Sequence, residues 1–191
     1  MGRAIRGADP SPSGALVRFT PLAIPGVWLV QLERRIDARG HFARTFCTSE
    51  FLAHGLPGTF SQCNLSFNIH RSTLRGLHWQ DDPYQEGKLV RCTSGAIFDV
   101  AVDIRLGSTT HGHWVAATLS AENADALYIP PGFAHGFQAL QDGTEVSYQM
   151  TEAYEDGFAR GLRWNDPTLA IVWPLPDPIL SDRDAALPLL S

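Results

Sequence analysis

Short apolar runs separated by turn residues make up most of the chain, and this pattern predicts β-strands. Two early runs, residues 16–20 and 27–33, are separated by Pro21 and by a Pro25-Gly26 turn. Four further runs follow from residue 88 onward, at residues 88–92, 96–104, 114–119 and 126–129. Strands at this spacing, with almost no helical periodicity, predict an all-β fold of the β-sandwich or jelly-roll kind.

One segment predicts a helix. Ser49 has a side-chain oxygen suited to cap residues 50–55, and Gly55 and Pro57 end the helix after a turn or two. We therefore expect a jelly-roll sandwich or barrel that carries only a few short helices.

Acidic residues interrupt the most apolar of the predicted strands. Asp99 and Asp103 share one side of it, whereas Phe98, Val100 and Val102 point to the other. Two placements remain open for the acidic pair. Both carboxylates face solvent, or they line the inner wall of a small barrel, where hydrogen bonds must offset their burial.

Length and composition indicate one ordinary globular domain. The chain has 191 residues, of which 44% are hydrophobic and 18% charged, and a formal net charge of −5. An acidic balance argues against a general nucleic-acid or anionic-membrane surface, because such surfaces need a basic face. We expect residues 1–14 to form a flexible tail and residues 15–191 to form the domain.

Targeting signals and cysteines point to a cytoplasmic protein. The first fourteen residues lack an apolar run long enough for a signal peptide, and no apolar stretch of 18 residues occurs. The three cysteines, Cys47, Cys63 and Cys92, are odd in number and lack metal-ligand spacing, so we expect them to be reduced.

The densest group of chemically useful residues lies at residues 74–80 (LRGLHWQ), with a lysine following. Arg75 is suited to bidentate phosphate binding, and Trp79 has a flat face on which a ring can stack. An imidazole such as that of His78 is suited to accepting a proton near neutral pH, while Lys88 offers a positive charge to an oxyanion. A lone histidine is more often structural, so the neighbours carry the argument for chemistry.

A second group, residues 129–137 (IPPGFAHGF), contains the Pro-x-Gly-x-x-His pattern with which cupin barrels place a histidine on an inner strand. A metal-binding cupin needs three or four converging ligands, and His135 with His78 falls short of that number. The one His-x-His pair, His111 and His113, lies in a predicted turn. We therefore predict no metal site.

These two groups and several other short segments occur in the same order along the chain as the motifs of a known family. From about residue 19 to residue 188, the chain resembles the dTDP-4-dehydrorhamnose 3,5-epimerases of the cupin superfamily. The matching segments are residues 39–42, 62–66, 74–78, 88–91, 99–105, 129–137, 164–167, 173–174 and 180–184.

The resemblance implies a cofactor-free jelly-roll homodimer that acts on a nucleotide-linked 4-keto-6-deoxy sugar, with dTDP as the expected nucleotide. It implies the catalytic base at His78, its orienting carboxylate at Asp184, the enolate-stabilising ammonium at Lys88 and the acid at Tyr148. Implied substrate contacts are Arg75, Arg39, Gln62, Asn64 and His135, to which the residues themselves add Arg44 and Trp79.

Some positions depart from the family pattern. Arg44 and Ala159 stand where the family usually has acidic residues, and Glu86 lies in the segment before Lys88. Because the region of Arg44 reaches the neighbouring subunit's nucleotide in the family, Arg44 either pairs with phosphate or marks a different base or sugar. The sequence does not decide whether C3, C5 or both are inverted.

Two rival functions remain open. A metal-dependent cupin isomerase or dioxygenase would require bound iron, manganese or zinc. A non-catalytic sugar-nucleotide binding module would bind the ligand without exchanging its ring protons.

Overall fold

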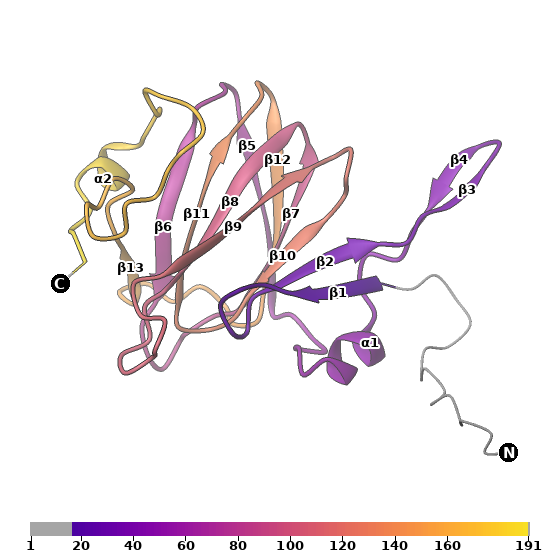
Figure 1. The fold of residues 1–191 in the computed structure, drawn as a ribbon, viewed down its shortest axis with the longest axis horizontal. Coiled ribbons are helices and arrows are strands. Elements are labelled where there is room, and N and C mark those ends of the chain that lie inside the picture. The colour runs from indigo at the N-terminus through magenta and orange to yellow at the C-terminus, as the bar shows by residue number, and fades with distance from the viewer. Residues whose placement is uncertain (1–16, 191) are drawn as a thin grey trace, which may run out of the picture.

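Antiparallel strands form two facing sheets in the part of the chain that the computed structural model describes, residues 17–190 (Figure 1). The six-stranded sheet has the order β1 (Val17–Pro21), β2 (Trp28–Leu32), β10 (Ala126–Ile129), β7 (Lys88–Ser94), β12 (Thr144–Met150) and β5 (Gln62–Asn68). The five-stranded sheet has the order β13 (Ala159–Gly161), β6 (Leu74–Gln80), β11 (Phe133–Ala139), β8 (Ala96–Asp103) and β9 (Trp114–Ser120).

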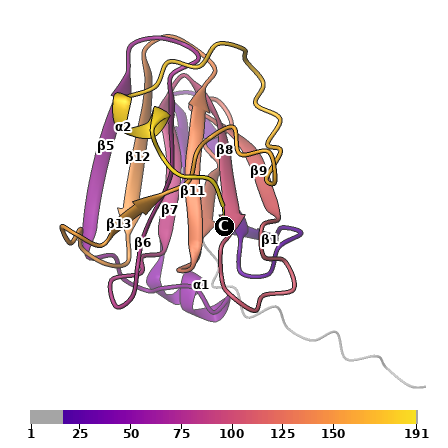
Figure 2. The same ribbon diagram turned by 90° about the vertical axis from the view of Figure 1, so that its left-hand side faces the viewer.

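Three smaller elements lie outside these sheets. A hairpin of β3 (Arg35–Asp37) and β4 (Gly40–Phe42) stands away from both sheets (Figure 1). The helix α1 (Thr48–Ala53) follows the hairpin, and the second helix, α2 (Asp182–Ala185), lies in the C-terminal segment next to β6 (Figure 2). The all-β jelly-roll prediction is confirmed.

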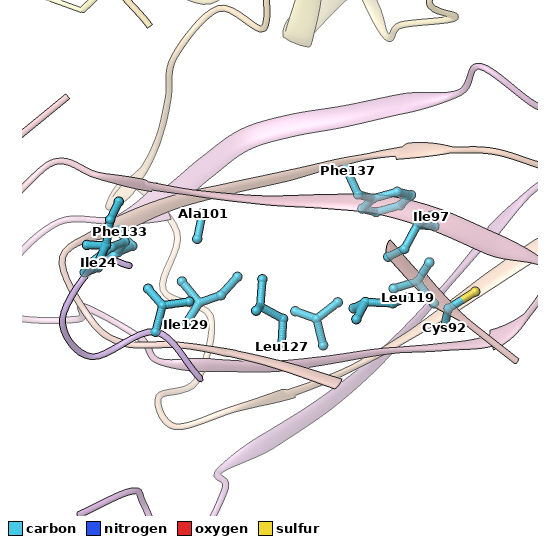
Figure 3. Packing of buried hydrophobic residues seen from close by; sticks show 12 residues of the cluster. Ile24, Cys92, Ile97, Ala101, Leu119, Leu127, Ile129, Phe133 and Phe137 are labelled. Atoms are coloured by element: carbon cyan, nitrogen blue, oxygen red, sulfur yellow. The ribbon is translucent and has the colours of Figure 1, made fainter. Parts of the chain in front are cut away.

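The hydrophobic core fills the space between the two sheets. Figure 3 shows Leu127 and Ile129 of the six-stranded sheet facing Phe133 and Phe137 of the five-stranded sheet. These side chains are at most 2% exposed. Burying a large apolar side chain contributes about 1.5–3 kcal/mol, so this layer holds the sheets together. Phe137 also reaches the cavity described below, which places that cavity directly beside the core.

The helix predictions were partly wrong. The first helix begins at Thr48, and its N-cap residue is Cys47, which makes no capping hydrogen bond with its side chain. Ser49 therefore lies inside the helix instead of capping it, and its hydroxyl contacts Cys47 Sγ at 3.2 Å. The second helix was not predicted, because four residues are too few to show helical periodicity.

The acidic pair of β8 is buried. Asp99 and Asp103 are both 0% exposed, so the solvent-facing alternative is wrong. Hydrogen bonds from Arg105, Ser108 and Thr110 hold Asp103, and although burial acts in the opposite direction, these bonds lower the pKa of Asp103 well below its ordinary value. Asp103 thus stays ionised and fixes the turn after β8.

Other expectations concern the ends of the chain, the thiols and membrane segments. The predicted tail, residues 1–14, falls outside the described residues. Cys47, Cys63 and Cys92 are free thiols, as expected. In the described part of the chain, no helix combines the length and apolar character needed to cross a membrane.

Candidate active site

A β-bulge in β6 directs two polar side chains into the same cavity. His78 pairs with His135 of β11 and Arg75 pairs with Phe137, so β6 has one extra residue between the two pairs. In a regular strand, residues three apart point to opposite faces, so it is the bulge that turns Arg75 and His78 to the same side of the sheet. Gly76 provides the bulge: its φ is 127°, and a Cβ there would lie 2.5 Å from the Cα of Gly136.

A carboxylate from the far end of the chain holds the imidazole of His78. Oδ1 of Asp184 lies 2.7 Å from Nε2 of His78, and its Oδ2 accepts the backbone N–H of Gly76 at 3.2 Å. Burial alone would raise the pKa of Asp184, but the hydrogen bonds from the His78 side chain and the Gly76 backbone lower that pKa below its ordinary value. An ionised carboxylate only accepts, so Nε2 carries a proton toward Asp184, and in the neutral imidazole the lone pair then lies on Nδ1.

Lys88, the first residue of β7, reaches across from the other sheet. Its Nζ donates to the backbone oxygen of His78 at 2.9 Å and forms an ion pair with Glu86 Oε1 at 3.0 Å. The residue is 6% exposed, and it still lines the cavity. The ammonium is thereby fixed in the cavity wall, against the backbone of His78.

Tyr148 lies on β12, in the sheet opposite β6. Its hydroxyl is 3.0 Å from the hydroxyl of Ser66 on the adjacent strand. Burial raises the pKa of the Tyr148 phenol well above its ordinary value. The phenol is consequently protonated at neutral pH and is a proton donor, not a base.

A second imidazole–carboxylate pair lies beside the first. Nε2 of His135 is 2.7 Å from Oδ1 of Asp99, and His135 is the register partner of His78. Asp99 Oδ2 has no hydrogen-bond partner among the described residues. His135 lines the cavity with its ring edge-on to Tyr148, at a centroid distance of 6.1 Å.

One continuous cavity collects most of the predicted site residues. It consists of two adjoining hollows that share Asn64, His78, Lys88, Met150 and Arg183. The first hollow is completed by Gln62, Trp79, Gln80, Glu86, Glu152, Tyr154, Ala159 and Arg160. The second is completed by Leu65, Ser66, Arg75, His135, Phe137, Tyr148, Ser181 and Asp184.

Two predicted contacts do not reach this cavity within one chain. Arg39 lies in the β3–β4 hairpin and pairs with Asp37 at 2.6 Å. Arg44 pairs with Glu50 of α1, also at 2.6 Å. Their roles toward a nucleotide stay predictions, and the resemblance assigns that region to the neighbouring subunit's site.

Sequence reasoning gave no role to several residues of the cavity wall. Arg183 lines both hollows. It directly precedes Asp184 in the sequence, and this neighbour is the feature that could have pointed to it. Glu86 lies two residues before Lys88 and was noted only as a departure from the family pattern. Ser66 contacts Tyr148, and Asp99 contacts His135. The spacing of these residues in the sequence predicts neither contact.

Side chains that could bind a metal ion do not gather at one place in the described residues. No three His, Cys, Asp or Glu side chains there are placed to hold a metal ion. His111 and His113 lie in the turn between β8 and β9, as predicted.

A jelly roll with an imidazole–carboxylate pair, a phenol and an ammonium around one cavity is the arrangement of a cupin-type isomerase. Comparison with known proteins makes the class specific. Residues 21–191 match the family model described as dTDP-4-dehydrorhamnose 3,5-epimerase. The chain belongs to this family.

Individual relatives agree with the family match. The dTDP-4-dehydrorhamnose 3,5-epimerase of Sinorhizobium fredii is 44% identical over 173 residues, which cover 90% of this chain and 89% of the relative. A dTDP-4-dehydrorhamnose 3-epimerase of Streptomyces niveus is 40% identical, covering 88% and 81%. The crystal structure of the Bacillus anthracis 3,5-epimerase with TDP and PPi bound has a TM-score of 0.89 and 38% identity, covering 92% of this chain and 100% of that one.

The family match and these relatives define the activity. The protein is an isomerase that epimerises a dTDP-4-keto-6-deoxyhexose, at C3 and C5 or at C3, in deoxysugar biosynthesis.

Proposed function

We propose that His78 is the base that removes the ring proton next to the keto group. The observation that carries this proposal is the shared cavity: His78, Lys88 and Tyr148 come from three strands in two sheets and all line it. The free Nδ1 of His78 accepts the proton, and Asp184 stabilises the imidazolium that results.

Lys88 is proposed to stabilise the enolate that this proton transfer creates. Negative charge then develops on the former keto oxygen, and a buried ammonium offsets it. Fixed electrostatic partners of this kind are worth about 3–4 kcal/mol in a site that excludes water. Tyr148 lies on the opposite sheet and donates its proton to the enolate carbon from the other face, after which it regains a proton from solvent.

The basic residues of the cavity are proposed to bind the diphosphate of the substrate. Arg75 is already oriented, because its Nε donates to Asn68 Oδ1 at 2.8 Å. Arg183 lines the same hollow, and Gln62 and Asn64 add amide groups at the wall. The TDP bound in the Bacillus anthracis relative supports this assignment. Trp79 and His135 complete the wall, with the Trp79 ring held by a hydrogen bond from Nε1 to Asp81 at 2.9 Å.

Incubation with dTDP-4-keto-6-deoxyglucose in heavy water tests the proposed function. We expect deuterium at C3 and C5 of the product, read by NMR, and faster turnover than with the GDP or CDP counterparts. Deuterium at C3 alone would assign the chain to the 3-epimerases. Binding without deuterium uptake would contradict the proposal in favour of a binding module, and loss of turnover with a chelator would favour a metal-dependent cupin.

We also propose that the enzyme works as a homodimer. The hairpin presents Ile36 and Phe42, which are 80% and 70% exposed, and the edge strand β5 presents Leu65 and Phe67 at 63% and 57%. The hairpin follows β2 near one edge of the six-stranded sheet and β5 forms the other edge, and large apolar side chains exposed in pairs at such places are typical of a protein interface. A second chain that covers them brings Arg39 and Arg44 toward a neighbouring cavity.

Sedimentation of the purified protein tests this assembly. We expect twice the mass of one chain at micromolar concentration. Phe42→Asp places a charge in the proposed interface and is expected to shift the mass toward that of one chain, whereas Leu106→Asp, at a residue 93% exposed in the turn after β8, is the matched control. A single-chain mass for the unchanged protein would contradict the proposed dimer.

A further inference from the structure

Glu86 is a buried carboxylate in the wall of the cavity, and the acid–base set leaves it without a role. Its side chain is 4% exposed and lies in the loop between β6 and β7. Oε1 lies 3.0 Å from Nζ of Lys88, and Oε2 accepts the backbone N–H of Gln80 at 3.1 Å. Both oxygens are therefore held, one by the ammonium and one by the backbone of β6.

The contacts of Lys88 link the two sheets at this point. Lys88 belongs to the six-stranded sheet, while His78 and Gln80 lie on β6 of the five-stranded sheet. An ammonium has three N–H donors, and the described residues use two of them, for Glu86 and for the backbone oxygen of His78. One donor is left for a ligand, and the two protein partners fix its direction.

Charge makes the contact between Glu86 and Lys88 specific. A buried ammonium or carboxylate without a partner is strongly destabilising, so each of these residues offsets the charge of the other inside the protein. Glu86 is the one acidic residue in the described chain that forms an ion pair with Lys88. The other charged or titratable groups of the cavity wall are His78, Glu152, Tyr154, Arg160 and Arg183 in the first hollow, and Arg75, His135, Tyr148 and Asp184 in the second.

We propose that Glu86 is a positioning residue of the epimerase, which aims the free N–H of the Lys88 ammonium at the oxygen of the enolate. The inference rests on the proposed role of Lys88. Enolate charge exists only after proton removal, so a misaimed ammonium weakens the transition state more than the bound substrate. The loss should therefore fall on kcat and not on KM.

Glu86→Gln tests the inference, because it removes the charge and nearly preserves the shape. We expect kcat for deuterium uptake at the sugar ring to fall about 10-fold to 100-fold, with KM unchanged. Glu86→Asp keeps the charge in the fold but withdraws it by one methylene, and should lose less kcat, again without a change in KM. The matched control is Glu122→Gln, at an exposed carboxylate in the turn after β9, which should behave as the unchanged enzyme.

The same substitution in a Lys88→Met background separates positioning from folding. There, Glu86→Gln should cause no further loss of turnover, because the group it aims is gone. An equal loss with and without Lys88 would overturn the inference, as would an unchanged or raised kcat in Glu86→Gln. Full turnover in Lys88→Met alone would instead refute the proposed role of Lys88, so the two failures are distinguishable.

Discussion

Replacement of His78 by alanine is expected to abolish epimerisation. Positioned acid–base groups contribute about 10²–10⁴-fold each, and the proposed mechanism gives the first proton transfer to this side chain alone. Asp184 is a poor substitute, because its Oδ2 is bonded to the Gly76 N–H and a carboxylate is a weaker base than an imidazole. Deuterium uptake and inversion should therefore be lost together.

NMR in heavy water measures both quantities in one sample. His113→Ala is the matched control, because this imidazole is exposed in the turn between β8 and β9 and lies outside the cavity wall. Binding of dTDP to His78→Ala should stay near that of the unchanged enzyme, which separates lost chemistry from a lost pocket. Deuterium uptake at the normal rate in His78→Ala would show that another group is the base.

Strand prediction succeeded where a short apolar run is bounded by turn residues. The run at residues 126–129 matches β10, and the run at residues 88–92 is the beginning of β7. The strands β5 and β6 were not predicted, because their inward faces carry polar residues such as Asn64, Ser66 and His78. Strands that line a cavity carry polar side chains on their inward face, where a core strand carries apolar ones. The alternation of apolar and polar residues therefore does not reveal the strands that form the functional site.

The candidate site was predicted from the sequence only where its residues lie close together in the chain. The cluster from Arg75 to Lys88 was found from local sequence, whereas Asp184 is 106 residues away from His78 and came only from the family resemblance. No local pattern predicts that contact. Glu86 lacked a role for a related reason: its contact with Lys88 depends on how the loop before β7 folds back against Gln80.

Replacement of Tyr148 by phenylalanine is expected to separate proton exchange from inversion. The substitution removes the acidic hydroxyl and leaves the ring that packs beside His135 and Phe137. His78 still removes the ring proton and returns a deuteron to the same face. Deuterium uptake should therefore continue within about 10-fold of the normal rate, while inversion falls by about 10²–10⁴-fold.

The Tyr148 hydroxyl carries the proton that its proposed role as the acid requires. Burial raises the pKa of Tyr148, so at neutral pH the group holds a proton that it can donate to the enolate carbon. Tyr128→Phe is the matched control, because it removes another buried tyrosine hydroxyl, one that lies in a different apolar cluster and outside the cavity wall. If Tyr148→Phe lowers exchange and inversion equally, Tyr148 acts before or during proton removal, and the opposite-face acid must be sought among the other groups of the cavity.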